Sequence, residues 1–221
     1  AGRRSRDELR AARSRVAGFA SEPPRRALPT VDVLDEDRVE AMHEASLHVL
    51  QELGIEFMGT AARRALADVG ASVDDETCLV RFPRELVEHC LEQAPSTFTV
   101  ASRNPARSLE LGGDHVAFGL VAGPPNVHDR VNGRRPGSLE DYVKLVSLAH
   151  SFDVIHFIGN QPTPPVELPA NTRHLDCYLA NVIYSDRVYH CTAIGRDRAV
   201  DGIELMAISR GLTLEEVIDE P

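Results

Sequence analysis

The sequence predicts an α/β protein in which an N-terminal α+β region precedes repeated β-α units. Residues 138–221 follow the order α-β-α-β-α-α, and their strand segments are almost continuously apolar. This pattern is typical of parallel strands that are buried on both faces and joined by crossover helices. Residues 34–137 instead alternate helical patterns with short β-like runs that are separated by polar turns. We therefore expect two regions of different architecture.

Composition excludes several classes of protein. The chain has 221 residues, of which 43% are hydrophobic, and a formal net charge of −10. Nucleic-acid-binding modules normally present a basic face, and a membrane helix needs about 18 or more consecutive apolar residues. Neither feature is present in the sequence, so we expect neither nucleic acid nor membrane as a partner. Four cysteines without a C-x-x-C pair predict free thiols and a cytoplasmic protein.

The first 33 residues differ from the rest of the chain. Eight arginines and the pair Pro23-Pro24 fall within the first 26 positions. No apolar stretch of the kind found in signal peptides follows them. We interpret residues 1–33 as a mobile arm.

Within residues 34–137, helix signals come first. Asp35 is placed to cap a helix that ends before Gly54, and its expected apolar face is formed by Val39, Met42, Ser46, Val49, Leu50 and Leu53. A short helix over 60–70 and a strand over 79–82 follow. A third helix begins near Pro83, and its expected buried stripe is formed by Leu86, Val87, Cys90, Leu91 and Ala94. β-like runs are predicted at 98–101, 108–111 and 115–120.

Residues 138–221 carry the repeated units. Ser138 and Asp141 form a capping box that starts a helix running to about residue 151. Strands are predicted at 153–159 and 187–193, with a helix over 175–183 between them and helices at 201–210 and from residue 213. We expect the two strands to be parallel neighbours joined by a right-handed crossover.

Candidate site residues lie at the ends of these two strands. In a (β/α) barrel the chemistry takes place at the carboxyl ends of the strands. We therefore predict that Asn160, Gln161 and Thr192 face one substrate-binding cavity, with His156 and His190 close to it or beneath it. The alternative is that Asn160 and Gln161 cap the proline-rich loop 162–169 through backbone hydrogen bonds.

Metal and aromatic sites are weaker hypotheses. His174 with Cys177, and His190 with Cys191, do not supply the three or four ligands of a zinc site, so we predict no metal. Three aromatic side chains are compatible either with a cage for a quaternary ammonium group or with core packing. They are Phe157, Tyr178 and Tyr189.

An ordered set of segments resembles the trimethylamine–corrinoid methyltransferase family. The set begins with Leu34-Asp35-Glu36-Asp37, His43-Glu44-Ala45-Ser46 and Leu50-Gln51-Glu52-Leu53-Gly54-Ile55-Glu56-Phe57. It continues with Gly70-Ala71-Ser72-Val73-Asp74, Val80-Arg81-Phe82-Pro83, Ala94-Pro95, Arg103-Asn104-Pro105, Gly112-Gly113, Asp129, Gly133-Arg134-Arg135 and Asp141. The resemblance covers residues 34–221.

The resemblance implies a TIM-type (β/α) barrel that is incomplete in this chain, with residues 34–137 as the preceding α+β region and 138–221 as the first barrel units. It also implies transfer of a methyl group from a methylamine or quaternary amine, such as trimethylamine or a betaine, to the cobalt of a corrinoid. A separate partner protein carries that corrinoid, and none is bound directly here. A homo-oligomer is expected at full length. The resemblance assigns no catalytic residue.

Two alternatives remain. One is a different enzyme that shares only the barrel scaffold, because fold does not fix function. The other is a non-catalytic fragment or assembly module. We expect the 221 residues alone to be inactive.

Overall fold

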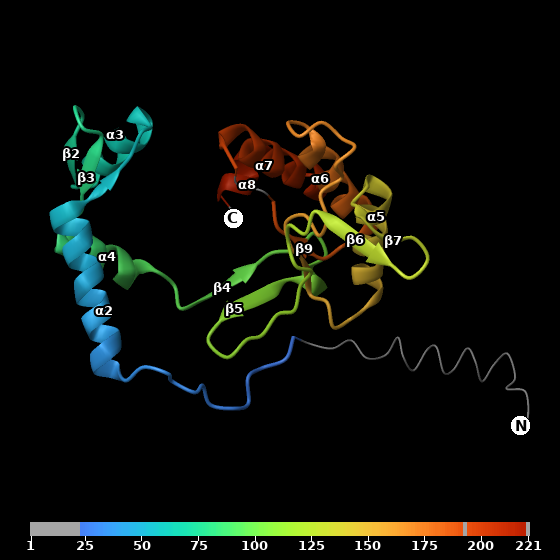
Figure 1. Cartoon of the computed structure of the whole chain (residues 1–221), viewed down its shortest axis with the longest axis horizontal. Helices are drawn as coiled ribbons and strands as arrows, with labels where there is room; N and C mark the ends of the chain where they lie inside the picture. The colour runs from blue at the N-terminus through green and yellow to red at the C-terminus, as the bar shows by residue number, and fades with distance from the viewer. Residues whose placement is uncertain (1–22, 192–193, 220–221) are drawn as a thin grey trace, which may run out of the picture. The chain divides into compact units, whose positions relative to one another are not determined.

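A computed structural model describes residues 23–191 and 194–219. The chain forms two compact units, which are described separately. One comprises residues 28–96, and the other comprises residues 97–221 together with the described part of residues 1–27. Figure 1 shows a mixed α/β chain with small sheets, and in the described part no sheet closes into a barrel. No helix found among the described residues has the length and apolar character to cross a membrane.

The unit formed by residues 28–96 combines helices with a three-stranded antiparallel sheet. Its helices are α2 (Glu36–His48), α3 (Thr60–Asp68) and α4 (Arg84–Gln93), and a π-helical turn (Val49–Leu53) extends α2. The strands β1 (Ile55–Glu56), β2 (Ser72–Asp74) and β3 (Leu79–Arg81) lie in the order β1-β3-β2. Asp35 caps α2 as predicted, since its Oδ1 accepts a 2.9 Å hydrogen bond from the amide of Arg38.

The predicted apolar faces of two helices in this unit are not buried. Val39, Met42 and Leu53 are 54%, 62% and 65% exposed, whereas Leu47, outside the predicted face, is 3% exposed. In α4, Leu86 and Val87 are half-buried, but the rest of the predicted stripe, Cys90, Leu91 and Ala94, is exposed. A unit of this size has a small core, so the prediction of a buried stripe was wrong for Cys90, Leu91 and Ala94, and the apolar face predicted on α2 is largely exposed.

The second unit begins with two antiparallel strand pairs. β4 (Thr97–Val100) pairs with β5 (Leu109–Gly112), and a 3₁₀ turn (Pro105–Arg107) lies between them. β6 (Asn126–Asp129) and β7 (Gly133–Pro136) form a hairpin that the sequence did not predict. Part of the predicted arm is paired as well, because the amide of Arg26 donates to Asp114 O and the amide of Val116 donates to Pro24 O. Residues 1–22 lie outside the described part.

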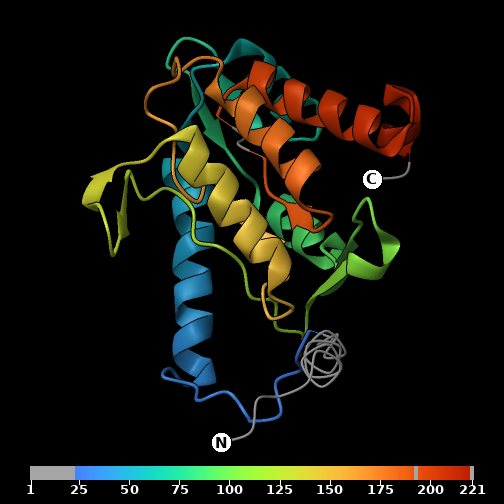
Figure 2. The ribbon, with the colours of Figure 1, turned by 90° about the vertical axis from the view of Figure 1, so that its right-hand side faces the viewer.

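The β-α units follow in the order α5 (Leu139–Ser151), β8 (Phe157–Ile158), α6 (Arg173–Tyr184), β9 (Val188–Tyr189), α7 (Arg196–Arg210) and α8 (Leu214–Asp219). β8 and β9 are parallel neighbours, which confirms the predicted pairing, although both strands are shorter than expected. α6 packs against α5 on one side and α7 on the other, as Figure 2 shows. The core beneath these helices is formed by Tyr142, Val146, Ile158, Cys177 and Ala180.

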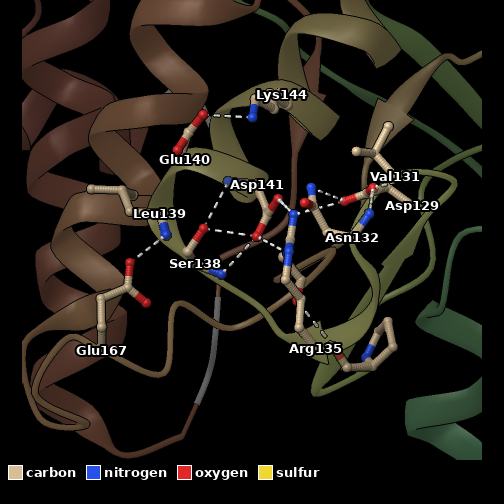
Figure 3. A network of polar contacts seen from close by, with 12 residues as sticks. Asp129, Val131, Asn132, Arg135, Ser138, Leu139, Glu140, Asp141, Lys144 and Glu167 are labelled. Carbon is tan, nitrogen blue, oxygen red and sulfur yellow. Dashed lines mark hydrogen bonds and ion pairs between the residues drawn. The ribbon is translucent and has the colours of Figure 1, made fainter.

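An ionic network fixes the start of α5 to the β6–β7 hairpin (Figure 3). The predicted capping box of Ser138 and Asp141 is present. The guanidinium of Arg135 also donates two hydrogen bonds to the Asp141 carboxylate, at 2.6 and 2.7 Å, and one of 3.0 Å to Asp129. Bidentate arginine–carboxylate pairs hold their partners in one orientation. The hairpin therefore helps to set the direction of α5.

A candidate substrate pocket at the strand ends

Three extended segments run parallel beneath the candidate site. Residues 118–120 lie beside β8 through a parallel bridge between Gly119 and Phe157, and β8 lies beside β9. The sequence predicted the 115–120 run but not its parallel pairing. Two glycines permit this close approach. A Cβ atom at Gly119 would lie 2.3 Å from the Phe157 ring, and one at Gly159 would lie 2.0 Å from the carbonyl oxygen of Leu120.

The loops that follow the first two segments are joined directly. The amide of Gly123 donates a 2.8 Å hydrogen bond to the carbonyl oxygen of Gln161. Gly123 has a φ of +94°, a conformation that favours glycine. The carboxyl ends of the segments therefore form one continuous edge.

An open pocket of about 420 Å³ lies at this edge. Its size falls in the range of small-molecule sites, which is roughly 300–1,000 Å³. The lining comes from the loops after the parallel segments and from the first turns of α6 and α7. The described residues that line it are Ala122, Gly123, Asn160, Gln161, Pro164, Ala170, Arg173, Ile194 and Arg198.

The pocket is locally basic although the chain is acidic overall. Two arginines and no acidic residue occur in its described lining. Arg198 Nη2 donates a 2.9 Å hydrogen bond to the carbonyl oxygen of Ala170. Arg173 Nε is buried, and none of the described residues accepts a hydrogen bond from it. The net charge of −10 therefore gives no guide to the charge of this pocket.

The predicted site residues are distributed as follows. Asn160 and Gln161 both line the pocket. The Asn160 Oδ1 atom is buried and has no hydrogen-bond partner in the described part of the chain. Thr192 lies outside the described residues. His156 and His190 are not among the described lining residues.

The two histidines have other surroundings. His156 immediately precedes β8, at the end of the strand opposite Asn160, and is 4% exposed. Its Nδ1 accepts a 2.9 Å hydrogen bond from the amide of Phe118, and burial lowers its pKa, with Arg187 and Arg107 adding to the effect. His156 is thus a neutral group within the strand layer. His190 is exposed, and its amide donates to the carbonyl oxygen of Ile158.

Sequence reasoning missed Arg173 and Arg198. The helix containing Arg198 was predicted to begin at residue 201, whereas α7 begins at Arg196. Arg198 therefore lies in the first turn, next to the preceding strand. Arg173 is the first residue of α6. Their place at the start of a helix after a strand could have identified them, because in β-α units the first helical turn lies close to the strand end.

The described residues do not support a zinc site or an aromatic cage for a quaternary ammonium group. No group of three or more His, Cys, Asp or Glu side chains there is placed to hold a metal ion. His174 Nε2 instead lies 2.6 Å from an Asp201 carboxylate oxygen. Burial raises the pKa of Cys177 to about 12 and that of Cys191 to about 11, so both thiols stay protonated near neutral pH. Tyr178 is 1% exposed and packs edge-on against His174, outside the described lining of the pocket.

Several proteins that are similar to this chain in sequence are named as methyltransferases. Over 184 residues the chain is 33% identical to a glycine betaine methyltransferase of Desulfitobacterium hafniense, a match that covers 83% of this chain and 38% of the relative. It is 30% identical over 145 residues to a proline betaine:corrinoid methyltransferase of Eubacterium limosum, covering 65% of this chain and 29% of the relative. A trimethylamine methyltransferase of Desulfitobacterium hafniense is 32% identical over 115 residues, covering 52% of this chain and 21% of the relative.

The chain thus spans well under half the length of each of these relatives. The family-wide comparison matches residues 1–221, which is the whole sequence. This agrees with the resemblance noted in the sequence. The chain belongs to the trimethylamine methyltransferase family.

Proposed function

We propose that the protein containing this chain transfers a methyl group from a methylated amine to the cobalt of a corrinoid carried by a separate protein. The observation that carries the proposal is the pocket that Asn160 and Gln161 line at the strand ends, in a chain of this family. The donors named for the relatives are trimethylamine, glycine betaine and proline betaine. A pocket of about 420 Å³ has room for donors of this size.

We further propose that residues 118–120, β8 and β9, with α6 and α7, belong to a TIM-type (β/α) barrel. Three observations support this: the parallel pairing, the helix that joins β8 to β9, and a pocket at the carboxyl ends of the strands. Residues 34–137 would form the α+β region before the barrel. Within that region, residues 118–120 would contribute to the barrel sheet, because Gly119 pairs with Phe157 of β8. Residues 1–33 would form an arm.

In the reaction, cobalt(I) of the corrinoid supplies the nucleophile and the amine is the leaving group. The residues of this chain would hold and orient the methyl donor, since correct placement of two reactants removes much of the barrier to their reaction. Asn160 and Gln161 offer amide donors and acceptors for that purpose, and Thr192 follows β9 at the corresponding position of the next strand.

The test is corrinoid methylation, followed by absorbance. The natural protein at the length of its relatives would be mixed with a reduced corrinoid protein and with trimethylamine, glycine betaine or proline betaine in turn. We expect methylation with at least one donor, and none with the 221-residue chain alone. Absence of methylation with every donor would contradict the proposal, and methylation by the monodisperse 221-residue chain would contradict the expected need for further residues.

A further inference from the structure

We propose that Arg173 and Arg198 form a carboxylate-binding subsite, so that the methyl donor carries a carboxylate as well as a methylated nitrogen. This inference rests on the proposed function and deepens it by choosing a class of donor. It assigns a role in specificity to two residues at the start of α6 and α7.

The pocket carries positive charge that no described side chain of its lining compensates. Both guanidinium groups line a pocket whose described lining contains no acidic side chain. In the described part of the chain, neither Arg173 nor Arg198 forms an ion pair with an aspartate or glutamate. Two positive charges at one pocket without a compensating anion favour an anionic ligand, because burying unpaired charge is unfavourable.

The two guanidinium groups do not use all of their hydrogen-bond donors within the described part of the chain. Arg173 Nε is buried and has no acceptor in the described part of the chain. Arg198 gives one bond, to the carbonyl oxygen of Ala170. A guanidinium group has five N–H donors in a planar fork that matches the two oxygens of a carboxylate. Because Arg173 Nε is buried, the donors left for a carboxylate in the pocket are the terminal Nη groups of Arg173 and the N–H groups of Arg198 that do not bond to Ala170.

The backbone around the two arginines belongs to the amino ends of two helices. α6 begins at Arg173 and α7 begins at Arg196, so the first turns of two helices with 12 and 15 residues reach the pocket. The amino end of a helix carries a partial positive charge and free amide donors. This field has the same sign as the arginines and strengthens the preference for an anion.

The positive charge of the pocket discriminates between methyl donors with and without a carboxylate. A donor with only an ammonium group meets like charge in this pocket and leaves both guanidinium groups uncompensated. A betaine would place its carboxylate against the two guanidinium groups, and its methylated nitrogen would then lie elsewhere in the pocket. Asn160 also lines the pocket, and its side-chain amide supplies a neutral polar group there.

The test is calorimetric binding to the natural protein at the length of its relatives, without corrinoid. The probes are glycine betaine, choline, which keeps the quaternary nitrogen but lacks the carboxylate, and inorganic phosphate. We expect the wild type to bind glycine betaine more tightly than choline. Arg173→Gln and Arg198→Gln should each weaken glycine betaine binding roughly tenfold or more, and neither should weaken choline binding, because each variant removes a charge that repels choline.

Arg196→Gln is the matched control. Arg196 lies two residues from Arg198 on the same helix, is exposed, and is not among the described lining residues, so its loss changes the net charge equally. It should leave glycine betaine binding unchanged. Equal weakening by all three variants would overturn the subsite in favour of a general charge effect. The wild type gives a test that needs no variant: acetate should compete with glycine betaine, and lack of competition would overturn the subsite.

Other outcomes separate the two proposals. Phosphate binding that is lost in both arginine variants but does not displace glycine betaine would show that the arginines bind a different anion and would overturn the subsite. Wild-type rates of corrinoid methylation from glycine betaine in both arginine variants would leave the proposed function intact and remove the subsite. Arginine-dependent binding of glycine betaine without corrinoid methylation by any donor would keep the subsite and remove the proposed function.

Discussion

The amide of Gly123 donates a 2.8 Å hydrogen bond to the carbonyl oxygen of Gln161. This bond joins the loops that follow residues 118–120 and β8, and both residues line the pocket. The wall of the candidate site is therefore partly backbone. Its geometry depends on glycine at positions where a side chain would disturb the backbone.

Gly123→Ala should destabilise the protein through backbone strain alone. No atom lies within 4 Å of the Cβ that the substitution would add, but φ is +94°. An L-residue held in a left-handed conformation costs about 1–2 kcal/mol, and urea unfolding measures this loss. Gly123→Asn is the control, because asparagine tolerates a left-handed backbone better than alanine and should therefore lose less stability. Equal stability of the two variants would contradict the strained geometry.

Gly159→Ala should lower the free energy of unfolding more than Gly119→Ala. The added Cβ at position 159 meets the Leu120 carbonyl oxygen at 2.0 Å, and a backbone atom cannot move without parting two strands. At position 119 the obstacle is the Phe157 ring, which is able to rotate. Overpacking of this kind costs roughly 1–3 kcal/mol, and we place Gly159→Ala at the upper end of that range. Thermal and urea unfolding measure the stabilities of the two variants. A less stable Gly119→Ala variant would contradict the close approach of residue 159 to Leu120.

Stability should fall in acid through the network in Figure 3. Hydrogen bonds from Arg135 lower the pKa of Asp141, and backbone and side-chain hydrogen bonds from Asn132 lower the pKa of Asp129 to about 2. Their carboxylates are favoured in the folded protein, so the unfolded chain binds more protons at low pH. This stabilisation is present above about pH 4 and should be lost as the pH falls towards 2.

Unfolding free energies measured from pH 2 to 5 test this prediction. Asp141→Asn should be less stable than the wild type at pH 5 and should lose less stability on acidification. Asp68→Asn is the control, since Asp68 is exposed on α3 and forms no ion pair with the described residues. Parallel pH curves for the wild type and Asp141→Asn would show that the network does not contribute.

Local signals in the sequence predicted local structure well. The Asp35 cap and the capping box of Ser138 and Asp141 depend on residues three positions apart, and both are present. The parallel pair formed by β8 and β9 followed from two apolar segments with a helix between them. In each case the interacting residues are close in sequence or the connection permits few arrangements.

Tertiary features were less predictable. Val39 and Met42 follow a helical repeat, yet both are exposed, because periodicity identifies a face and not what covers it. The pairing of Gly119 with Phe157 depends on residues 38 positions apart and on the absence of a side chain at position 119. Arg173 and Arg198 enter the pocket through the exact starts of α6 and α7, and helix boundaries are the least certain part of a sequence prediction.

The most direct test of the central claim is the kcat/KM for corrinoid methylation in pocket variants of the natural full-length protein. Asn160→Ala and Gln161→Ala should each lower kcat/KM for the methyl donor by roughly tenfold, because both side chains line the pocket, while urea unfolding stays unchanged. Gln51→Ala, an exposed substitution in the 28–96 unit, should match the wild type. Wild-type kcat/KM values in both pocket variants would contradict the assignment of the strand-end pocket as the donor site.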